Sequence, residues 1–146
     1  MSDAGDASSD RDLDAGMEVR RSVLGDEHVD RATERATEFT APFQEFITRY
    51  AWGAVWTREG LDRRTRSAVT LSVLAALGRE NEIAMHVRAA LRNGLTPAEI
   101  AEVFIHMSVY AGVPAANAAF AIAQPVIEAE SGPGGLARPP GETADS

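Results

Sequence analysis

Three polar residues at one predicted helix have the types and spacing that acid–base chemistry needs. Residues 80–92 are predicted to be helical, and this stretch holds Glu82 and His86, with Arg79 directly before it. Side chains three or four positions apart share one face of a helix, so all three are expected on one edge. A carboxylate one turn from an imidazole can orient the ring and raise its pKa, which suits a proton donor or acceptor. An arginine on the same edge can hold a substrate carboxylate in a bidentate grip.

The same spacing has a purely structural interpretation. Glu–His and Arg–Glu pairs are ordinary features of a solvated helix face and contribute little there. A histidine beside an apolar stripe, as His86 is beside Ile83 and Val87, is often structural. Spacing alone leaves both interpretations open.

A second histidine stands one turn before a tyrosine. His106 and Tyr110 could donate hydrogen bonds to a negatively charged oxygen that develops during a reaction. The alternative for His106 is a half-buried ring that a local carbonyl satisfies. The third histidine, His28, lies in an acidic segment and is expected to be an exposed surface residue.

A cluster of arginines opens another predicted helix, which begins near Asp62. The free N–H groups and the positive end of the helix dipole could help these side chains to capture an anion. The alternative is that they keep the protein soluble and pair with acidic helices. The members of the cluster are Arg63, Arg64 and Arg66.

Composition excludes several classes of chemistry. The chain of 146 residues contains no cysteine, so disulfides, thiolate catalysis, cysteine-ligated zinc and iron–sulfur clusters are ruled out. Three histidines without an HExxH spacing make a metal site unexpected, and no glycine-rich phosphate loop is present. The net charge of −8 disfavours nucleic acid and anionic membranes as partners. With no signal peptide and no membrane-length apolar run, we expect a cytoplasmic protein.

The segments that must position these residues are predicted to be helical throughout. Apolar residues recur at helical spacing, and no strand alternation is visible. Residues 52–60 are less regular and are predicted to form a loop or a distorted turn. Thr96, Pro97 and Glu99 form a capping box at one helix start. The helices are expected over residues 13–23, from 26, 43–50, 62–77, 80–92, 96–112 and from 114.

One domain, residues 11–130, is expected between a disordered leader (1–10) and a disordered tail (131–146). Both ends are rich in small and polar residues, and the tail carries Gly-Pro-Gly-Gly and Pro-Pro. Residues 68–77 are apolar almost all round. A helix without a polar face is normally buried on every side, so this one predicts a subunit interface.

Several motifs, in order, resemble those of the 4-carboxymuconolactone decarboxylase family, over about residues 14–127. They are RRSVLGDEHVDR (20–31), FQEFITRYAWG (43–53), WTR (56–58), RTRS (64–67), HVRAA (86–90), NG (93–94), EI (99–100) and YAGVPAAN (110–117). Related alkylhydroperoxidases of the same superfamily carry a Cys-x-x-Cys pair before the equivalent histidine. Arg79 and Glu82 stand at those positions here, so that redox chemistry is excluded and the two residues gain interest.

The resemblance implies the fold, the assembly and the reaction. The implied fold is all-α and alkylhydroperoxidase D-like, with about six or seven helices and a central antiparallel helical hairpin. Family members form homotrimers or homohexamers with sites close to subunit contacts. The implied reaction is the cofactor-independent decarboxylation of 4-carboxymuconolactone to β-ketoadipate enol-lactone and CO2, in the breakdown of protocatechuate by the β-ketoadipate pathway.

The resemblance also suggests roles for the candidate residues. His86 would be the catalytic proton donor, and Glu82 would orient it and keep it partly protonated. The lactone di-acid substrate would be gripped by Arg79 and Arg66, while its developing oxyanion would receive hydrogen bonds from His106 and Tyr110. Two alternatives stay open: a lyase acting on a related lactone or dicarboxylate, and a non-catalytic helical binding protein.

Overall fold

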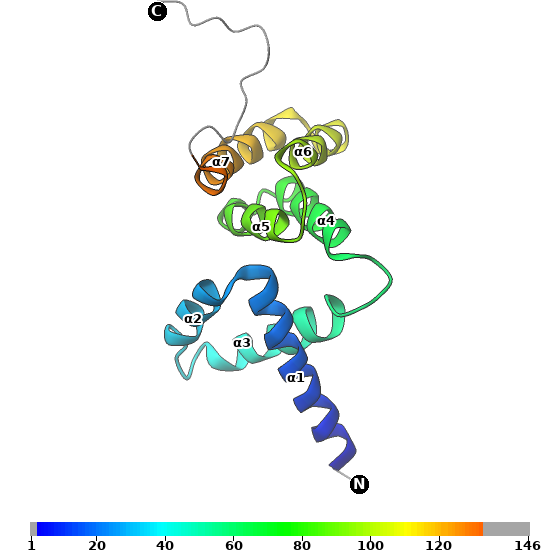
Figure 1. Cartoon of the computed structure of the whole chain (residues 1–146), viewed down its shortest axis with the longest axis vertical. Helices are drawn as coiled ribbons and strands as arrows, with labels where there is room; N and C mark the ends of the chain where they lie inside the picture. Colours follow the sequence, from blue (N-terminus) through cyan, green and yellow to red (C-terminus); the bar gives the residue numbers. More distant parts are fainter. Residues whose placement is uncertain (1–2, 133–146) are drawn as a thin grey trace, which may run out of the picture.

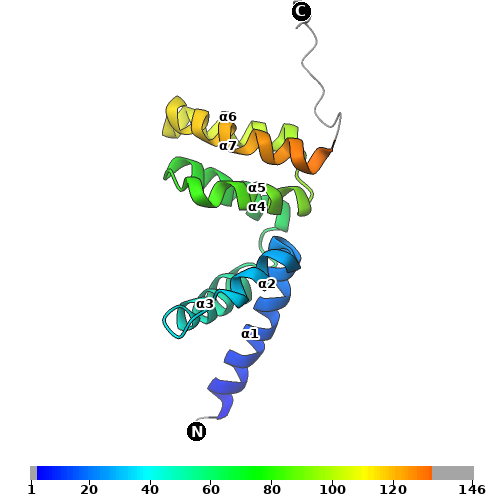
Figure 2. The ribbon, with the colours of Figure 1, turned by 90° about the vertical axis from the view of Figure 1, so that its left-hand side faces the viewer.

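The protein is built from α-helices and one π-helix, and the part of the chain that the structure describes contains no strand. The computed structural model describes residues 3–132. The first four elements form an N-terminal part and the last four a C-terminal part, seen as two separate groups in Figures 1 and 2. In chain order they are α1 (Asp3–Leu24), α2 (Asp26–Glu34), α3 (Ala41–Ile47), the π-helix η1 (Thr48–Val55), α4 (Arg63–Ala76), α5 (Glu80–Arg92), α6 (Pro97–Ala111) and α7 (Val113–Ser131).

The start of the chain differs from the sequence-based expectation. Residues 3–10, predicted to be a disordered leader, continue α1 as regular helix. Extending an existing helix forms one hydrogen bond for each residue fixed, which offsets the low helix propensity of Ser, Asp and Gly. The predicted disordered tail (131–146) lies, from residue 133 on, outside the described residues.

The segment predicted to be a loop or distorted turn is partly a π-helix. Residues 52–55 close η1, and irregular turns follow before α4. The π-helix packs against α1 backbone to backbone, because glycines meet at the crossing. A methyl group added to Gly16 would lie 2.8 Å from the backbone nitrogen of Gly53, and one added to Gly53 would lie 3.1 Å from the carbonyl carbon of Asp12. Only a residue without a side chain permits this approach.

Two hydrophobic clusters hold the fold together. The larger one lies among α4 to α7, with Leu71, Ile83 and Phe104 almost wholly buried. The smaller one joins α1, α2 and η1 through Val23, Val29, Trp52 and their neighbours. One helix, α5, contributes to both, with Ile83 in the first cluster and Ala89 in the second. This helix therefore lies between the two parts of the chain.

The predicted helix boundaries at α4 and α6 are confirmed. The Asp62 carboxylate accepts a hydrogen bond from the backbone N–H of Thr65 at 2.7 Å. The Thr96 hydroxyl accepts one from the N–H of Glu99, while the Glu99 carboxylate accepts one from the N–H of Thr96, which completes the capping box. Such caps satisfy N–H groups that have no partner within the helix.

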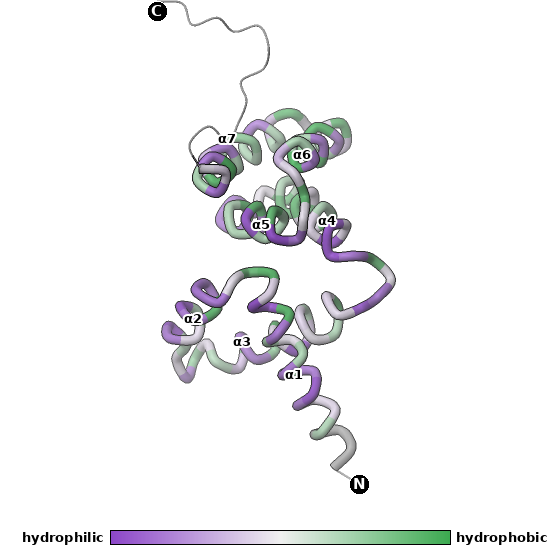
Figure 3. Tube along the Cα trace, viewed as in Figure 1, coloured by the Kyte–Doolittle hydropathy of each residue, from purple (hydrophilic) through white to green (hydrophobic). Residues whose placement is uncertain are grey.

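The apolar helix α4 buries only one side within the chain. Leu71 and Ala75 are buried, whereas Val69, Val73 and Leu77 are 49%, 47% and 62% exposed. Figure 3 shows more hydrophobic residues along α6 and α7 than along α1 and α2, while α4 is hydrophilic in its first turn and hydrophobic farther along. Burial of the exposed side by another subunit stays a prediction. No helix in the described part is long and apolar enough to cross a membrane.

Candidate active site

The site is built around His86, on the edge of α5 between the two hydrophobic clusters. Its neighbours Ile83, Val87 and Ala90 belong to the larger cluster, while Met85 and Ala89 belong to the smaller one. The ring is half-buried, and its Nδ1 atom is buried with no hydrogen-bond partner in the described part of the chain. Burial, and to a smaller extent positive charge on His28, lowers the pKa of His86 to about 4. The imidazole is therefore neutral at pH 7.

The predicted electrostatic role of Glu82 is not seen in the single chain. Glu82 is exposed, and none of the hydrogen bonds or ion pairs among the described residues joins it to His86. Burial dominates the pKa of His86 in the single chain, and Glu82 contributes no resolved change to it. The two residues do share an edge of α5, but Glu82 faces solvent.

The remaining predicted residues lie at other places. Arg79 is the exposed residue that precedes α5 and makes no side-chain capping bond. Arg66, on α4, is half-buried and donates from Nη2 to the carbonyl of Arg58 at 2.9 Å, while its Nε is buried without a partner. His106 and Tyr110 are exposed on α6, with their ring centres 5.5 Å apart. No hydrogen bond or ion pair of the described residues links these four to His86.

His106 lies in an apolar groove between α4 and α6, which is open to solvent. Ala68, Val69, Ser72 and Val103 form most of its walls, and Glu102 contributes a carboxylate. His86 does not line this groove. The predicted oxyanion donors and the predicted proton donor thus belong to different surfaces of one chain.

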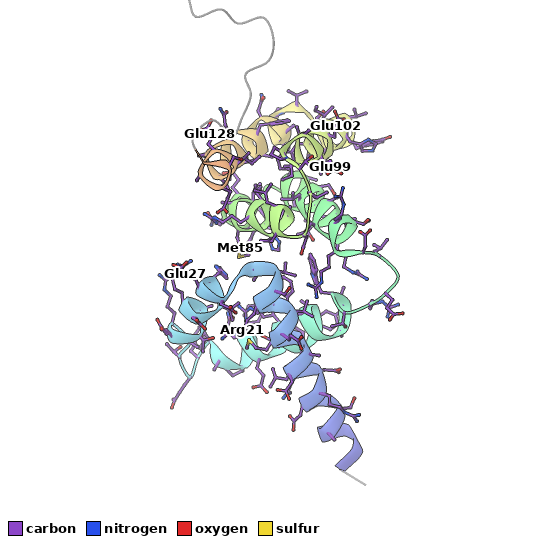
Figure 4. The ribbon with its side chains drawn as sticks, viewed as in Figure 1. Arg21, Glu27, Met85, Glu99, Glu102 and Glu128 are labelled. Atoms are coloured by element: carbon purple, nitrogen blue, oxygen red, sulfur yellow. The ribbon has the colours of Figure 1, made fainter. Side chains whose placement is uncertain are left out.

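His28 is half-buried, whereas its acidic neighbours in the sequence had suggested an exposed surface residue. It lines a polar pocket of about 240 Å³ between α2, α5 and the end of α7. Figure 4 shows Glu27 of α2 and Met85 of α5 on the facing sides of this junction. His28 precedes the half-buried Ala32 by four residues, so both lie on one face of α2. This four-residue spacing is the feature of the sequence that could have predicted an inward-facing ring.

Positive charge outweighs negative charge around this junction. The pKa of His28 is lowered by burial and then by Arg20, Arg31 and Arg88, with Glu82 acting weakly in the opposite direction. The pKa of Arg20 is also lowered by burial. The two carboxylates of the pocket pair with two of its three arginines, since Glu27 lies 2.9 Å from Arg31 and Glu130 lies 3.9 Å from Arg88. Among the described residues, Arg92 has no carboxylate partner. Such a field attracts small anions.

Residues 41–125 match the model of the carboxymuconolactone decarboxylase family. The chain belongs to this family. It is 53% identical to the 4-carboxymuconolactone decarboxylase of Acinetobacter baylyi over 113 residues, which cover 77% of this chain and 84% of the relative. It is 44% identical to a nitrosuccinic acid decarboxylase of Metarhizium robertsii over 84% of this chain and 88% of the relative. A 4-carboxymuconolactone decarboxylase sequence of Pseudomonas putida is 62% identical over 40 residues, which cover 27% of this chain and 83% of that sequence.

Membership of the carboxymuconolactone decarboxylase family agrees with the all-α architecture. The predicted alkylhydroperoxidase D-like fold class is confirmed, with α4 and α5 packed side by side as a hairpin joined by a tight turn at residues 77–79. Within the described residues, no group of three His, Asp or Glu side chains is placed to hold a metal ion.

Proposed function

We propose that this member of the carboxymuconolactone decarboxylase family is a carboxy-lyase that converts 4-carboxymuconolactone to β-ketoadipate enol-lactone and CO2 without a cofactor. The observation that carries the proposal is the 53% identity to an enzyme of that name, over 84% of that enzyme's length. The reaction belongs to the breakdown of protocatechuate. The proposed partner is thus a small lactone di-acid. We expect no nucleic acid or membrane as a partner, and we expect a cytoplasmic location.

The substrate can supply its own electron sink. One carbon of its butenolide ring carries a carboxylate and a carboxymethyl group. When the bond to the carboxylate breaks and CO2 leaves, the electron pair spreads through the ring double bond to the lactone carbonyl as a dienolate. A proton added to a ring carbon then gives the enol-lactone. The protein has to bind two carboxylates, stabilise the dienolate oxygen and deliver that proton.

His86 is the proposed proton donor. It is neutral in the free chain because its pKa is about 4. A dianion bound beside it would favour the charged imidazolium and raise that pKa, so that the ring takes up a proton together with the substrate. Glu82, at the same edge of α5, remains the proposed residue that orients His86 and supports its charged form. This sequence of events reconciles a depressed pKa with an acid catalyst.

The positively charged junction around His28 adds carboxylate-binding groups to those predicted from the sequence. Arg79 and Arg66 remain the proposed grips for the carboxymethyl arm. A tight grip on the departing carboxylate would stabilise the ground state rather than the transition state, so that group is expected in a less polar environment. His106 and Tyr110 remain the proposed oxyanion donors. Since they lie apart from His86 within one chain, we infer that they act on the site of a neighbouring subunit.

A homotrimer or homohexamer is part of this proposal. The exposed apolar residues of α4 and α6 support it, because monomeric proteins rarely expose contiguous apolar patches of this kind. Val69, Val73 and Leu77 on α4 and Ile105 and Val109 on α6 make up the surface that we call the α4–α6 face. Its groove already contains His106.

The test is turnover of freshly prepared 4-carboxymuconolactone by the purified protein, with a chelator present and no cofactor added. We expect CO2 release and enol-lactone formation, and a loss of kcat by about 10²-fold or more in His86→Ala with assembly intact. A folded, assembled wild-type protein without turnover would sink the proposal. Full activity of His86→Ala would remove the role of His86 alone.

A second candidate substrate class is supported by one comparison. The nitrosuccinic acid decarboxylase relative is 44% identical over 88% of its length. A substituted succinate also carries two carboxylates, so the same cationic groups could bind it. Including nitrosuccinate in the assay separates the two substrate classes. A kcat/KM that is higher for nitrosuccinate than for 4-carboxymuconolactone would identify substituted succinates as the substrates. Turnover of neither compound would favour a non-catalytic binding role.

A further inference from the structure

Arg20 on α1 is a buried cation with no counter-ion among the residues that the structure describes. Its side chain is 7% exposed. Nη1 donates to the Thr48 hydroxyl at 3.1 Å and Nη2 to the Gln44 side-chain oxygen at 2.9 Å, while Nε has no partner. Both acceptors are neutral, and no carboxylate of the described residues pairs with Arg20. Buried charges are normally paired, so this guanidinium is an exception that calls for an anion.

The guanidinium also has N–H groups to spare. It carries five, and each Nη atom uses one of its two in the bonds to Thr48 and Gln44. One N–H remains on each Nη atom. These two N–H groups are available to the oxygens of a carboxylate.

Arg20 lies at the wall of a pocket of about 310 Å³ between α1, α2 and α3. The rest of the wall is mostly apolar and comes from Leu13, Met17, Ala32, Ala36 and Ala41. A concave, largely apolar pocket with a few convergent polar groups is the usual form of a small-molecule site, and 310 Å³ lies at the small end of the range.

The acidic residue at this pocket does not neutralise Arg20. Glu45 lines the pocket, but its carboxylate pairs with Arg49 at 2.7 Å. Arg49 also lies 3.6 Å from Asp10. The positive charge of Arg20 is therefore open to an anion that enters from solvent.

We propose that the α1–α2–α3 pocket binds a small monocarboxylate with an apolar body, its carboxylate on Arg20 and its body against the alanine, leucine and methionine walls. The lactone di-acid of the proposed reaction fits this pocket poorly, because its second carboxylate would face apolar side chains. The pocket shares no lining residue with the pocket around His28, although the charge of Arg20 acts on the pKa of His28. It does not depend on the proposed decarboxylation.

The experiment uses benzoate as the probe and benzyl alcohol as its neutral counterpart, each titrated into the full-length protein by calorimetry. We expect benzoate to bind and to raise the melting temperature, with benzyl alcohol about tenfold weaker or more. Arg20→Met should weaken benzoate by about tenfold or more. Arg21→Met is the matched control, since the neighbouring Arg21 is ion-paired with Asp30 at 2.8 Å and does not line the pocket; its benzoate affinity should equal that of the wild type.

Ala32→Phe keeps Arg20 and fills the pocket, so it tests benzoate binding in this pocket even if Arg20→Met does not fold. The Ala32→Phe variant should lose benzoate binding. Undetectable benzoate binding by the wild type, equal binding of benzyl alcohol, or wild-type affinity in Arg20→Met or Ala32→Phe would overturn the proposal. His86→Ala should bind benzoate normally, so failure of this site and failure of the decarboxylase proposal are distinguishable.

Discussion

The imidazole of His28 on α2 lies close enough to that of His86 on α5 for positive charge on one to lower the pKa of the other. The two rings come from the two parts of the chain, and both are half-buried. The junction thus joins two titratable groups, and burial disfavours the charged form of both. The stability of the fold and the binding of substrate at this junction should therefore both depend on pH.

The stability of the folded protein should fall as the pH drops below about 6.5. The pKa of His86 is about 4 in the folded chain, whereas an unfolded histidine has a value near 6.5, so the unfolded state binds more protons between these values. The contribution of His86 to the free energy of unfolding is fully present above pH 6.5 and is lost as the pH falls toward 4. Between pH 7.5 and pH 5 it amounts to about 2 kcal/mol, measurable by urea unfolding at both pH values.

The control for this effect is His86→Gln, which removes the titrating group. Its free energy of unfolding should change less between pH 7.5 and pH 5 than that of the wild type. The remaining change should include a contribution of the same sign from His28, because its pKa is also lowered. Identical pH dependence in wild type and His86→Gln would contradict the depressed pKa.

Substrate binding should take up a proton near neutral pH. His86 is neutral in the free protein, and a dianion beside it raises its pKa. Calorimetric titration of a non-reacting dicarboxylate analogue, in two buffers of different ionisation enthalpy, measures this uptake directly. We expect protons to be bound by the wild type and fewer in His86→Gln. An observed heat that does not depend on the buffer would contradict the proposed acid role.

Sequence patterns predicted the regular helices well, because their signals are local. The capping box at Thr96 and the cap at Asp62 each act within one helical turn, so the starts of α6 and α4 follow from adjacent residues. The apolar stripe of α5 likewise gave the right buried residues, with Ile83 and Val87 in the core.

The missed features depend on contacts between distant segments. The π-helix η1 packs against α1 through a close contact between Gly16 and Gly53. Neither segment predicts this contact on its own, because the two glycines lie far apart in the sequence. The position of Glu82 on the edge of α5 was predictable, but its exposure depends on where the N-terminal part packs. His28 was missed because its acidic neighbours suggested solvent, whereas its partners on α5 lie far along the chain.

The contact between α1 and η1 predicts a large difference between two glycine substitutions. Gly53→Ala would place a methyl group against the Asp12 backbone, so we expect destabilisation by about 1–3 kcal/mol. Gly60→Ala is the matched control, because nothing lies within 4 Å of its added methyl group and its backbone φ is not positive. Its stability should stay within about 0.5 kcal/mol of the wild type. Thermal and urea unfolding check both, and equal stability of the two variants would show that the helices do not meet as described.

The α4–α6 face predicts that one charge disrupts the proposed assembly. Val73 is 47% exposed and lies on this face, so Val73→Glu should leave the single chain folded while placing a carboxylate in an apolar contact between subunits. We expect light scattering after size exclusion to show trimers or hexamers for the wild type and smaller species for Val73→Glu.

Phe39→Glu, a similar change at a residue that is 93% exposed and outside this face, should keep the wild-type assembly. If His106 and Tyr110 act on a neighbour's site, Val73→Glu should lose turnover together with its assembly. A monomeric wild type, or an assembly that survives Val73→Glu, would place the oxyanion donors elsewhere.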